Sequence, residues 1–423
     1  MSAMGRTGWV PVTDAKTARR CWGVIEDVER ALSESPPDPD PLFSSGSSGL
    51  AVFFAYLDAA RPGSDAGDRA LDELGRSIDG LGEASLLPAL YNGFSGIGWS
   101  VEHLTREFFE ADEDLTAAID EALKGLLSVP GLKLNHELIG GLAGFGTYLL
   151  ERLPHPAAEG LLARVLDRLE ETAEESEAGI TWHTAPEWIP GWQRDSLSEG
   201  CYNLGVAHGV PGVLGFLAEA QRQGVRDSRV QRLAGGIARW LLGQRLQDDG
   251  SRFPAIAVPG KKADPTRSAW CYGDPGIAAV LLSAARAFGR PDWEEEAVSM
   301  MRLVARRPLR DIAADDAGLC HGAAGLAHLF NRFHQATGDP GFREASLDWY
   351  RRTLDMQRPG EGLAGYQSFL ASGRGGDGSW IPQSGFLVGI AGIGLALLAA
   401  VSEVEPSWDR VLLTAIPPSK ETP

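Results

Sequence analysis

The stretch Cys320-His-Gly-Ala-Ala-Gly-Leu326 contains one copy of a Gly-x-x-Gly motif that occurs seven times in this chain of 423 residues. The copies are Gly46-Ser-Ser-Gly49, Gly93-Phe-Ser-Gly96, Gly141-Leu-Ala-Gly144, Gly209-Val-Pro-Gly212, Gly273-Asp-Pro-Gly276, Gly322-Ala-Ala-Gly325 and Gly389-Ile-Ala-Gly392. An apolar stretch of helical length follows each copy, and each interval between copies accommodates two helices. A repeat of this kind predicts one repetitive architecture that uses the whole chain.

Two kinds of helical pattern alternate between the motifs. Amphipathic patterns, with apolar residues at i, i+3, i+4 and i+7, cover residues 115–127, 157–173, 230–246 and 293–304. The segments after the glycines, such as 213–220, 277–287 and 326–333, are apolar on every side, which indicates complete burial. We therefore expect an all-α fold, an α/α toroid (double α-barrel) of seven helical hairpins whose inner helices start at the Gly-rich motifs.

The alternative to a closed toroid is an open solenoid, which would need polar repeats at its two ends. The last repeat, residues 385–394, is as apolar as any other, so closure against the first repeat fits better. We expect residues 1–423 to form a single toroid domain, with an N-terminal helix and loop at 1–45 that lead into the first repeat.

Composition limits the classes of partner and the compartment. The formal net charge of −18 argues against a nucleic-acid partner, which needs clustered Lys and Arg. No apolar run reaches the roughly 20 residues of a membrane span, and the first thirty residues lack the apolar region of a signal peptide. A cytoplasmic location is expected. Four cysteines in so long a chain do not make a disulfide framework, and in a reducing compartment they favour metal binding or catalysis.

Ligand-type residues gather directly before the glycines of three successive repeats. The pairs are Ala207-His208, Cys271-Tyr272 and Cys320-His321, which a toroid would place on one sector of its inner rim. Two thiolates and one imidazole select zinc over hard cations, and three protein ligands leave a fourth position open, as in catalytic sites. Adjacent helical residues diverge by about 100°, so Cys320 and His321 can share an ion only from a turn. Alternatively, these are buried apolar cysteines and a core histidine, or Cys201 closes a structural zinc site.

These motifs resemble those of the lanthionine synthetase C-like cyclases. The likeness rests on Ala207-His208-Gly209, Trp270-Cys271-Tyr272-Gly273 and Cys320-His321-Gly322, and it covers almost the whole chain. That family is a zinc-containing α/α toroid whose bacterial members close thioether rings in lantibiotic precursors such as that of nisin. The resemblance implies one Zn²⁺ held by Cys271, Cys320 and His321.

The same resemblance implies acid/base or positioning roles for His208, Arg267 and Tyr272, since Arg267-Ser-Ala-Trp-Cys271 matches the family's Arg-x-x-Trp-Cys. Tyr272 could instead only fill the centre of the toroid with its ring. Glu137, in Glu137-Leu-Ile-Gly-Gly141, stands where the family usually has Asp. It could orient His208 and raise its pKa, but its extra methylene could alter the contact.

The implied reaction adds a peptide Cys thiol to dehydroalanine or dehydrobutyrine. The expected partner is a dehydrated precursor peptide, supplied by a separate dehydratase and passed to an exporter, which could hold the enzyme at the membrane periphery. Alternatives are addition of glutathione to dehydrated residues in proteins, a non-catalytic peptide-binding toroid with a structural zinc, and a glycosidase, which needs two carboxylates in the cleft.

One insertion departs from the repeat pattern. Residues 179–195 contain Trp182, Trp188 and Trp192 among prolines. Tryptophans in such a segment either line a peptide groove or pin the segment onto the body of the protein by burying their rings.

Overall fold

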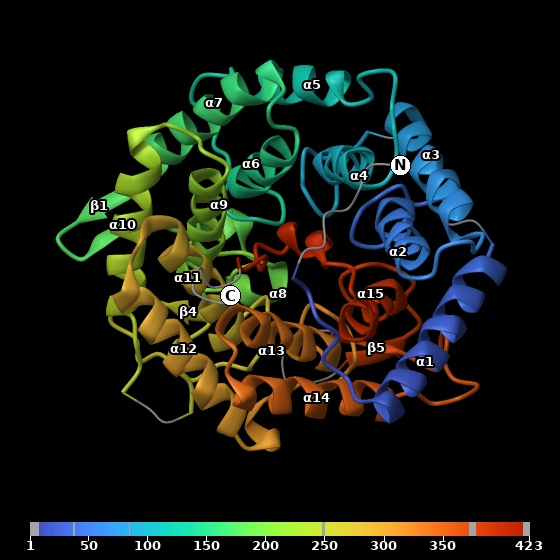
Figure 1. Cartoon of the computed structure of the whole chain (residues 1–423). Coiled ribbons are helices and arrows are strands. Elements are labelled where there is room, and N and C mark those ends of the chain that lie inside the picture. Colours follow the sequence, from blue (N-terminus) through green and yellow to red (C-terminus); the bar gives the residue numbers. More distant parts are fainter. Residues whose placement is uncertain (1–7, 37–38, 84, 248–249, 372–377, 418–423) are drawn as a thin grey trace.

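The helices form two concentric rings in the computed structural model of the chain (Figure 1), which describes residues 8–36, 39–83, 85–247, 250–371 and 378–417. The inner ring consists of α2 (Ser47–Ala60), α4 (Phe94–Glu107), α6 (Leu142–Glu151), α9 (Val210–Arg222), α11 (Asp274–Phe288), α13 (Ala323–Thr337) and α15 (Ile390–Val401). The outer ring consists of α1 (Ala15–Glu34), α3 (Ala66–Glu83), α5 (Ala117–Leu127), α7 (Pro156–Thr172), α10 (Ser228–Gly243), α12 (Pro291–Arg306) and α14 (Pro340–Asp355). The expected α/α toroid is confirmed.

The two rings differ in burial as the sequence patterns predict. In α11, every residue from Asp274 to Ala285 is buried, because this inner helix is surrounded by its neighbours and by its outer partner. In α12, burial is confined to one stripe that includes Trp293, Ala297 and Met301. The outer helices therefore cover the inner ring with one apolar face each and present the opposite face to solvent.

The N-terminal helix closes the ring. The last inner helix, α15, has no outer helix after it in the chain, and α1 packs against it instead. Just before α1, the Val12 N–H donates to the Ala400 carbonyl (3.0 Å) and the Trp9 indole N–H to that of Ala399 (3.0 Å). Helix α1 thus completes the seventh hairpin, although it precedes the first in sequence.

The glycine motifs permit a close contact at the start of each inner helix. The loop before the helix folds back so that a backbone carbonyl lies against the second glycine of the motif. A methyl group at that glycine would overlap this carbonyl in every repeat, in the pairs Gly49/Phe43, Gly96/Leu90, Gly144/Leu138, Gly212/Val206, Gly276/Trp270, Gly325/Leu319 and Gly392/Phe386. A residue with a Cβ would push the loop away from the helix.

The loops themselves are joined by a closed circle of backbone hydrogen bonds. The residue two positions before each first glycine donates its N–H to the carbonyl of the equivalent residue in the next repeat. The circle runs Ser44 to Tyr91 (3.0 Å), Tyr91 to Ile139 (3.2 Å), Ile139 to Ala207 (3.3 Å), Ala207 to Cys271 (3.4 Å), Cys271 to Cys320 (3.3 Å), Cys320 to Leu387 (2.8 Å) and Leu387 back to Ser44 (3.3 Å). It fixes equivalent positions of all seven repeats around one centre.

The C-terminal segment fills the opposite end of the toroid. Residues 405–417 lie across the middle of the ring, in red in Figure 1, against the later turns of the inner helices. Asp409 is fully buried and pairs with Arg332 (2.6 Å) and His328 (2.7 Å), and Arg410 pairs with Glu151 (2.6 Å). The access to the centre that matters for function is therefore at the motif end.

Additional structure gathers at the motif end, because it is inserted between an outer helix and the next inner helix. The inserted elements are β1 (Glu174–Ser176), β2 (Gly179–Thr181), η1 (Pro186–Trp188), α8 (Gly191–Arg194), β3 (Tyr202–Asn203), β4 (Ile256–Ala257), η2 (Leu309–Asp311), β5 (Ser368–Ala371) and β6 (Gly378–Ile381); η3 (Ser407–Arg410) belongs to the C-terminal segment. The strands form three antiparallel pairs, β1–β2, β3–β4 and β5–β6. Connections at the other end are short, such as residues 289–290. Among the described residues, no helix combines the length and hydropathy needed to cross a bilayer.

Replacing Gly96 with Ala tests the contact that starts each inner helix. The added methyl would overlap the Leu90 carbonyl, which cannot move without shifting the loop, so the variant should lose about 1–3 kcal/mol of unfolding free energy. Gly125, in α5, has open space around its Cα, and Gly125→Ala should instead add about 0.5–1 kcal/mol. Urea denaturation of both variants measures the difference; equal stabilities would contradict the proposed role of the motif.

Candidate metal centre and active site

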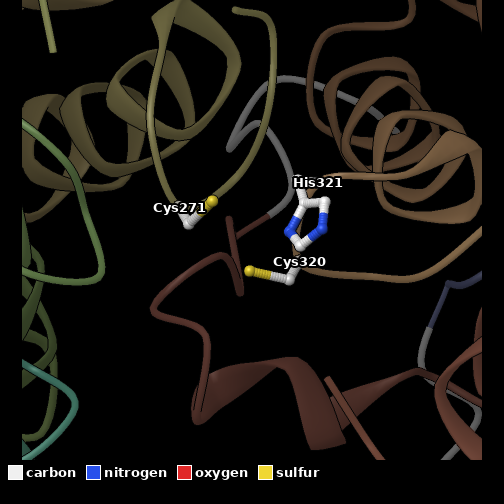
Figure 2. Close-up of side chains that lie close together, drawn as sticks. All are labelled: Cys271, Cys320 and His321. Carbon is white, nitrogen blue, oxygen red and sulfur yellow. The ribbon is translucent and has the colours of Figure 1, made fainter. Parts of the chain in front are cut away.

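Three ligand-type side chains converge at the motif end of the toroid. The Sγ atoms of Cys271 and Cys320 and a ring nitrogen of His321 all lie within 4.8 Å of one another. In Figure 2 the two sulfur atoms and the imidazole surround a common space. The three residues that the sequence places at matched positions are therefore brought together. Cys201 is outside this group, which has no fourth member among the residues described.

The circle of backbone hydrogen bonds explains this convergence. Because the Cys271 N–H donates to the Cys320 carbonyl (3.3 Å), the loops before α11 and α13 lie side by side. Cys320 and His321 are in the turn that precedes Gly322, and not in α13 itself. Both side chains can point to the same space from a turn, as the sequence argument required.

The donor set suits zinc. Tetrahedral coordination with Zn–S near 2.3 Å and Zn–N near 2.0–2.1 Å places ligand atoms roughly 3.5–3.8 Å apart. The three ligand atoms lie within 4.8 Å of one another, which is compatible with this spacing. Two sulfurs and one nitrogen match the preference of zinc for soft and borderline ligands, and a fourth position stays free for a substrate atom.

The cysteines of the chain differ in acidity. Hydrogen bonding from the Cys320 thiol lowers the pKa of Cys271, with further help from His321 and Arg267, while the pKa of Cys320 is raised by the same contact and by burial. Burial alone raises the pKa of Cys201 to about 11, and it is the main cause that raises that of Cys21 to about 12. Cys271 is therefore the thiol most ready to ionise.

Asp316 supports His321 from the side away from the sulfurs. One ring nitrogen of His321 faces the thiols in Figure 2, and the other, Nε2, lies 3.7 Å from Asp316 Oδ2. Asp316 is fixed in turn, because it accepts the backbone N–H of Gly318 on Oδ1 (3.1 Å) and that of Phe369 on Oδ2 (3.1 Å). At 3.7 Å the carboxylate is within ion-pair distance of the imidazole but is not hydrogen-bonded to it, so it acts on His321 through its charge. The sequence argument missed Asp316, although a polar residue recurs six positions before the first glycine in Asp40, Asn135 and Asn203.

A cavity of about 500 Å³ opens beside the metal ligands. Its lining contains Cys271 together with His208, Arg267 and Tyr272, three of the four residues expected to act in catalysis. No carboxylate lines it among the described residues, whereas a glycosidase would need two. The fourth expected residue, Glu137, is buried behind His208.

Glu137 contacts His208 in spite of its extra methylene. The Oε2 atom of Glu137 lies 2.7 Å from Nδ1 of His208, and its carboxylate also accepts the backbone N–H groups of Ile139 (3.1 Å) and Gly140 (2.6 Å). Burial disfavours the charged imidazole, but the hydrogen bond and the negative charge of Glu137 outweigh it, so the pKa of His208 is raised. With 48% of its side chain exposed, His208 presents its other nitrogen to the cavity.

A hydrogen bond fixes the position of the Tyr272 hydroxyl group. Its Oη accepts a hydrogen bond from the Asn203 side chain (3.0 Å), which leaves the phenolic proton available for a further bond, and the ring centre is 6.2 Å from that of His208. Tyr272 lines the cavity with this proton available, and a donor role for it stays a prediction. Asn203, which sets this orientation, was not identified from the sequence.

The sequence of the chain matches a known protein family and two characterised relatives. The family model described as "Lanthionine synthetase C-like protein" matches residues 38–413. The chain is 26% identical over 266 residues to "Nisin biosynthesis protein NisC" of Lactococcus lactis subsp. lactis, a match that covers 59% of this chain and 62% of that relative, less than two thirds of its length. It is 24% identical over 366 residues to "Glutathione S-transferase LANCL1" of Danio rerio, covering 81% and 84% of the two chains.

Among solved structures, the toroid is similar to "Nisin cyclase", with a TM-score of 0.74 at 20% sequence identity over 95% of this chain and 98% of that chain. At this identity the likeness concerns the fold. It agrees with the ring of seven inner and seven outer helices.

The acidity differences predict the order in which the thiols react. Because the thiolate is the nucleophile, iodoacetamide should modify Cys271 of the metal-free protein at neutral pH at least about tenfold faster than Cys201. Cys201 lines the same cavity and is the control for access. Peptide mass spectrometry over time measures both rates, and added zinc should slow the reaction of Cys271. Equal rates for the two thiols would contradict the assignment.

Proposed function

Because the chain belongs to the lanthionine synthetase C-like family, we propose that it is a zinc-dependent lanthipeptide cyclase, an enzyme of the lyase class. It adds Cys thiols of a dehydrated precursor peptide to dehydroalanine or dehydrobutyrine and so forms lanthionine or methyllanthionine rings. The observation that carries this proposal is the convergence of Cys271, Cys320 and His321, of which Cys271 lines a cavity together with His208 and Arg267. A separate dehydratase makes the substrate, and the reaction takes place in the cytoplasm, where the four cysteines stay reduced.

Cys271, Cys320 and His321 would hold the zinc ion, whose chemical contribution is to lower the pKa of a peptide thiol from its usual value near 8.5. Asp316 acts on His321 through its charge in this role. The remaining steps depend on side chains of the cavity.

Addition forms a bond between sulfur and the β-carbon, and the alkene electrons move onto the neighbouring carbonyl oxygen. The guanidinium of Arg267 is permanently cationic and would stabilise that oxygen as negative charge develops. The protonated His208 then transfers its proton to the α-carbon and is reprotonated from solvent, which has taken up the proton of the thiol, so the addition is complete without loss of any atom. Glu137 keeps His208 protonated and oriented, and Tyr272 positions the peptide by a hydrogen bond.

A second candidate function is the addition of glutathione to dehydrated residues in proteins. The similarity to a relative named as a glutathione S-transferase favours it. The two reactions give different products, because ring closure leaves the peptide mass unchanged and consumes a peptide thiol, whereas this reaction adds the mass of one glutathione. A non-catalytic toroid with a structural zinc would need a fourth protein ligand, and the group of described residues has three.

Loss of one ligand tests the metal and the chemistry together. Cys320→Ala should lower both zinc affinity and the rate of cyclisation by roughly 100-fold or more, because even loss of a residue that only supports a ligand costs 10–100-fold. Cys21→Ala is the matched control and should keep about one zinc per chain and normal turnover, since Cys21 lies in α1, outside both the ligand group and the cavity. Zinc content and loss of free thiols on a dehydrated peptide are the measurements. Cyclisation by Cys320→Ala at the parental rate would refute the mechanism.

The pH dependence tests the acid. Since Glu137 raises the pKa of His208, the imidazolium survives to higher pH and activity falls as pH rises through that raised pKa. Glu137→Gln removes the charge, so the alkaline limb of kcat/KM should move to lower pH. Glu137→Asp keeps the charge and should leave the limb near its parental position. The assignment fails if Glu137→Gln leaves the alkaline limb in place.

A further inference from the structure

The cavity beside the metal ligands has two chemically different walls. One wall comes from the ring of loops and carries polar or reactive groups, among them His208, Arg267 and Cys271. The other wall comes from the insertions and is mainly apolar. Its residues include Trp188, Ile189, Pro190 and Leu197 from the insertion before α9, and Ile256 from the insertion before α11. The mechanism proposed above uses only the first wall.

The apolar wall is built into the fold. Ile189, Leu197 and Cys201 form a small apolar cluster of their own, against which Ile256 and Val258 pack. Backbone hydrogen bonds between Thr184 and Cys201 (2.8 and 3.1 Å) close the segment on itself. The β3–β4 pairing, Asn203 with Ile256, joins the two insertions. A wall held in this way is preorganised, so a ligand that contacts it does not have to order it first.

The tryptophans of the insertion have different positions. Trp182 is buried, and its indole N–H donates to the Leu169 carbonyl (3.1 Å), so it pins the segment to the body of the protein. Trp188 lines the cavity and remains 46% exposed. The side chain of Trp192 lies outside the described residues. Trp182 therefore has the pinning role, whereas Trp188 offers the cavity a large apolar surface that a ligand could cover.

We propose that this wall is a subsite for a bulky apolar side chain of the residue next to the reacting cysteine of the peptide. The inference rests on the proposed function. When a peptide binds with its cysteine thiol beside Cys271, the Cα atoms of the residues before and after that cysteine are each about 3.8 Å from the cysteine Cα. These residues therefore enter the same cavity. A volume of about 500 Å³ is in the range of pockets that enclose a small ligand, and it can take the thiol together with one large side chain.

This subsite restricts the peptides that the protein can use more than the polar wall, which comes from the ring of loops, does. A leucine, isoleucine or phenylalanine next to the cysteine would bury its own side chain against Trp188 and Ile189. A serine or a charged residue would leave the apolar surface of Trp188 and Ile189 exposed to water. Glutathione has a γ-linked glutamate and a glycine beside its cysteine and offers no such group. The wall therefore favours a peptide whose cysteine has an apolar neighbour over a small hydrophilic thiol.

The experiment compares dehydrated model peptides that differ only in the residue before or after the cysteine, Leu against Ser, with the zinc-loaded protein. Thiol loss gives kcat/KM for the parent, Trp188→Ala, Trp188→Phe and Trp380→Ala. Trp380 is the matched control, because it is 49% exposed, lies in β6 and does not line this cavity. The parent should prefer Leu at one of the two positions by about 10- to 100-fold.

Trp188→Ala should lose most of this preference, chiefly through KM, while Trp188→Phe and Trp380→Ala keep it. Unchanged zinc content and melting temperature would show that Trp188→Ala is folded with its ligands in place. Equal kcat/KM for Leu and Ser peptides in the parent, or a full preference in Trp188→Ala, would overturn the subsite while leaving the cyclase function intact. No thiol loss with any peptide would overturn the proposed function and the subsite with it.

Discussion

The circle of seven backbone hydrogen bonds, from Ser44 through Cys271 and Cys320 back to Ser44, is the constraint on which the rest of the structure depends. It can form only because the loop before each inner helix folds tightly against glycines that have no Cβ. Once formed, it fixes the residues just before the glycines at one centre. Side chains at equivalent positions of neighbouring repeats then meet at distances suited to a common ligand.

The toroid uses this frame asymmetrically. The end of the toroid opposite to the glycine motifs is filled by residues 405–417, which are held by buried ion pairs such as Asp409 with Arg332. A substrate can therefore reach the centre from the motif end. Functional side chains occur on only one sector of that end. Repeats three and four supply Glu137 and His208, and repeats five and six supply Cys271 and Cys320 two positions before the first glycine, where repeats one and seven have Ser44 and Leu387. The insertions beside this sector supply the second, apolar wall of the cavity.

Much of the site was predictable because the repeat gives each residue a defined position relative to the first glycine of its motif. Cys271, Cys320 and His321 were identified as a group from their positions relative to the glycines, and they do converge. His208 was identified from its position before Gly209, whereas Glu137 came from the family resemblance, and the two side chains lie 2.7 Å apart. Asp316 and Asn203 escaped notice, although each stands six positions before the first glycine of its repeat. Trp188 was noted together with Trp182, but it lies in an insertion, where no periodicity relates sequence position to direction in space.

By itself, the sequence determined the alternation of inner and outer helices, the closed toroid and the candidate metal ligands, since each depends on local spacing that repeats along the chain. Only the tertiary structure decided that α1 pairs with α15, that Asp316 supports His321, and that Trp188 faces the cavity while Trp182 is buried. These contacts join segments far apart in the chain or irregular loops. Their geometry follows from ring closure and from packing against neighbours, which local patterns of hydrophobicity do not specify.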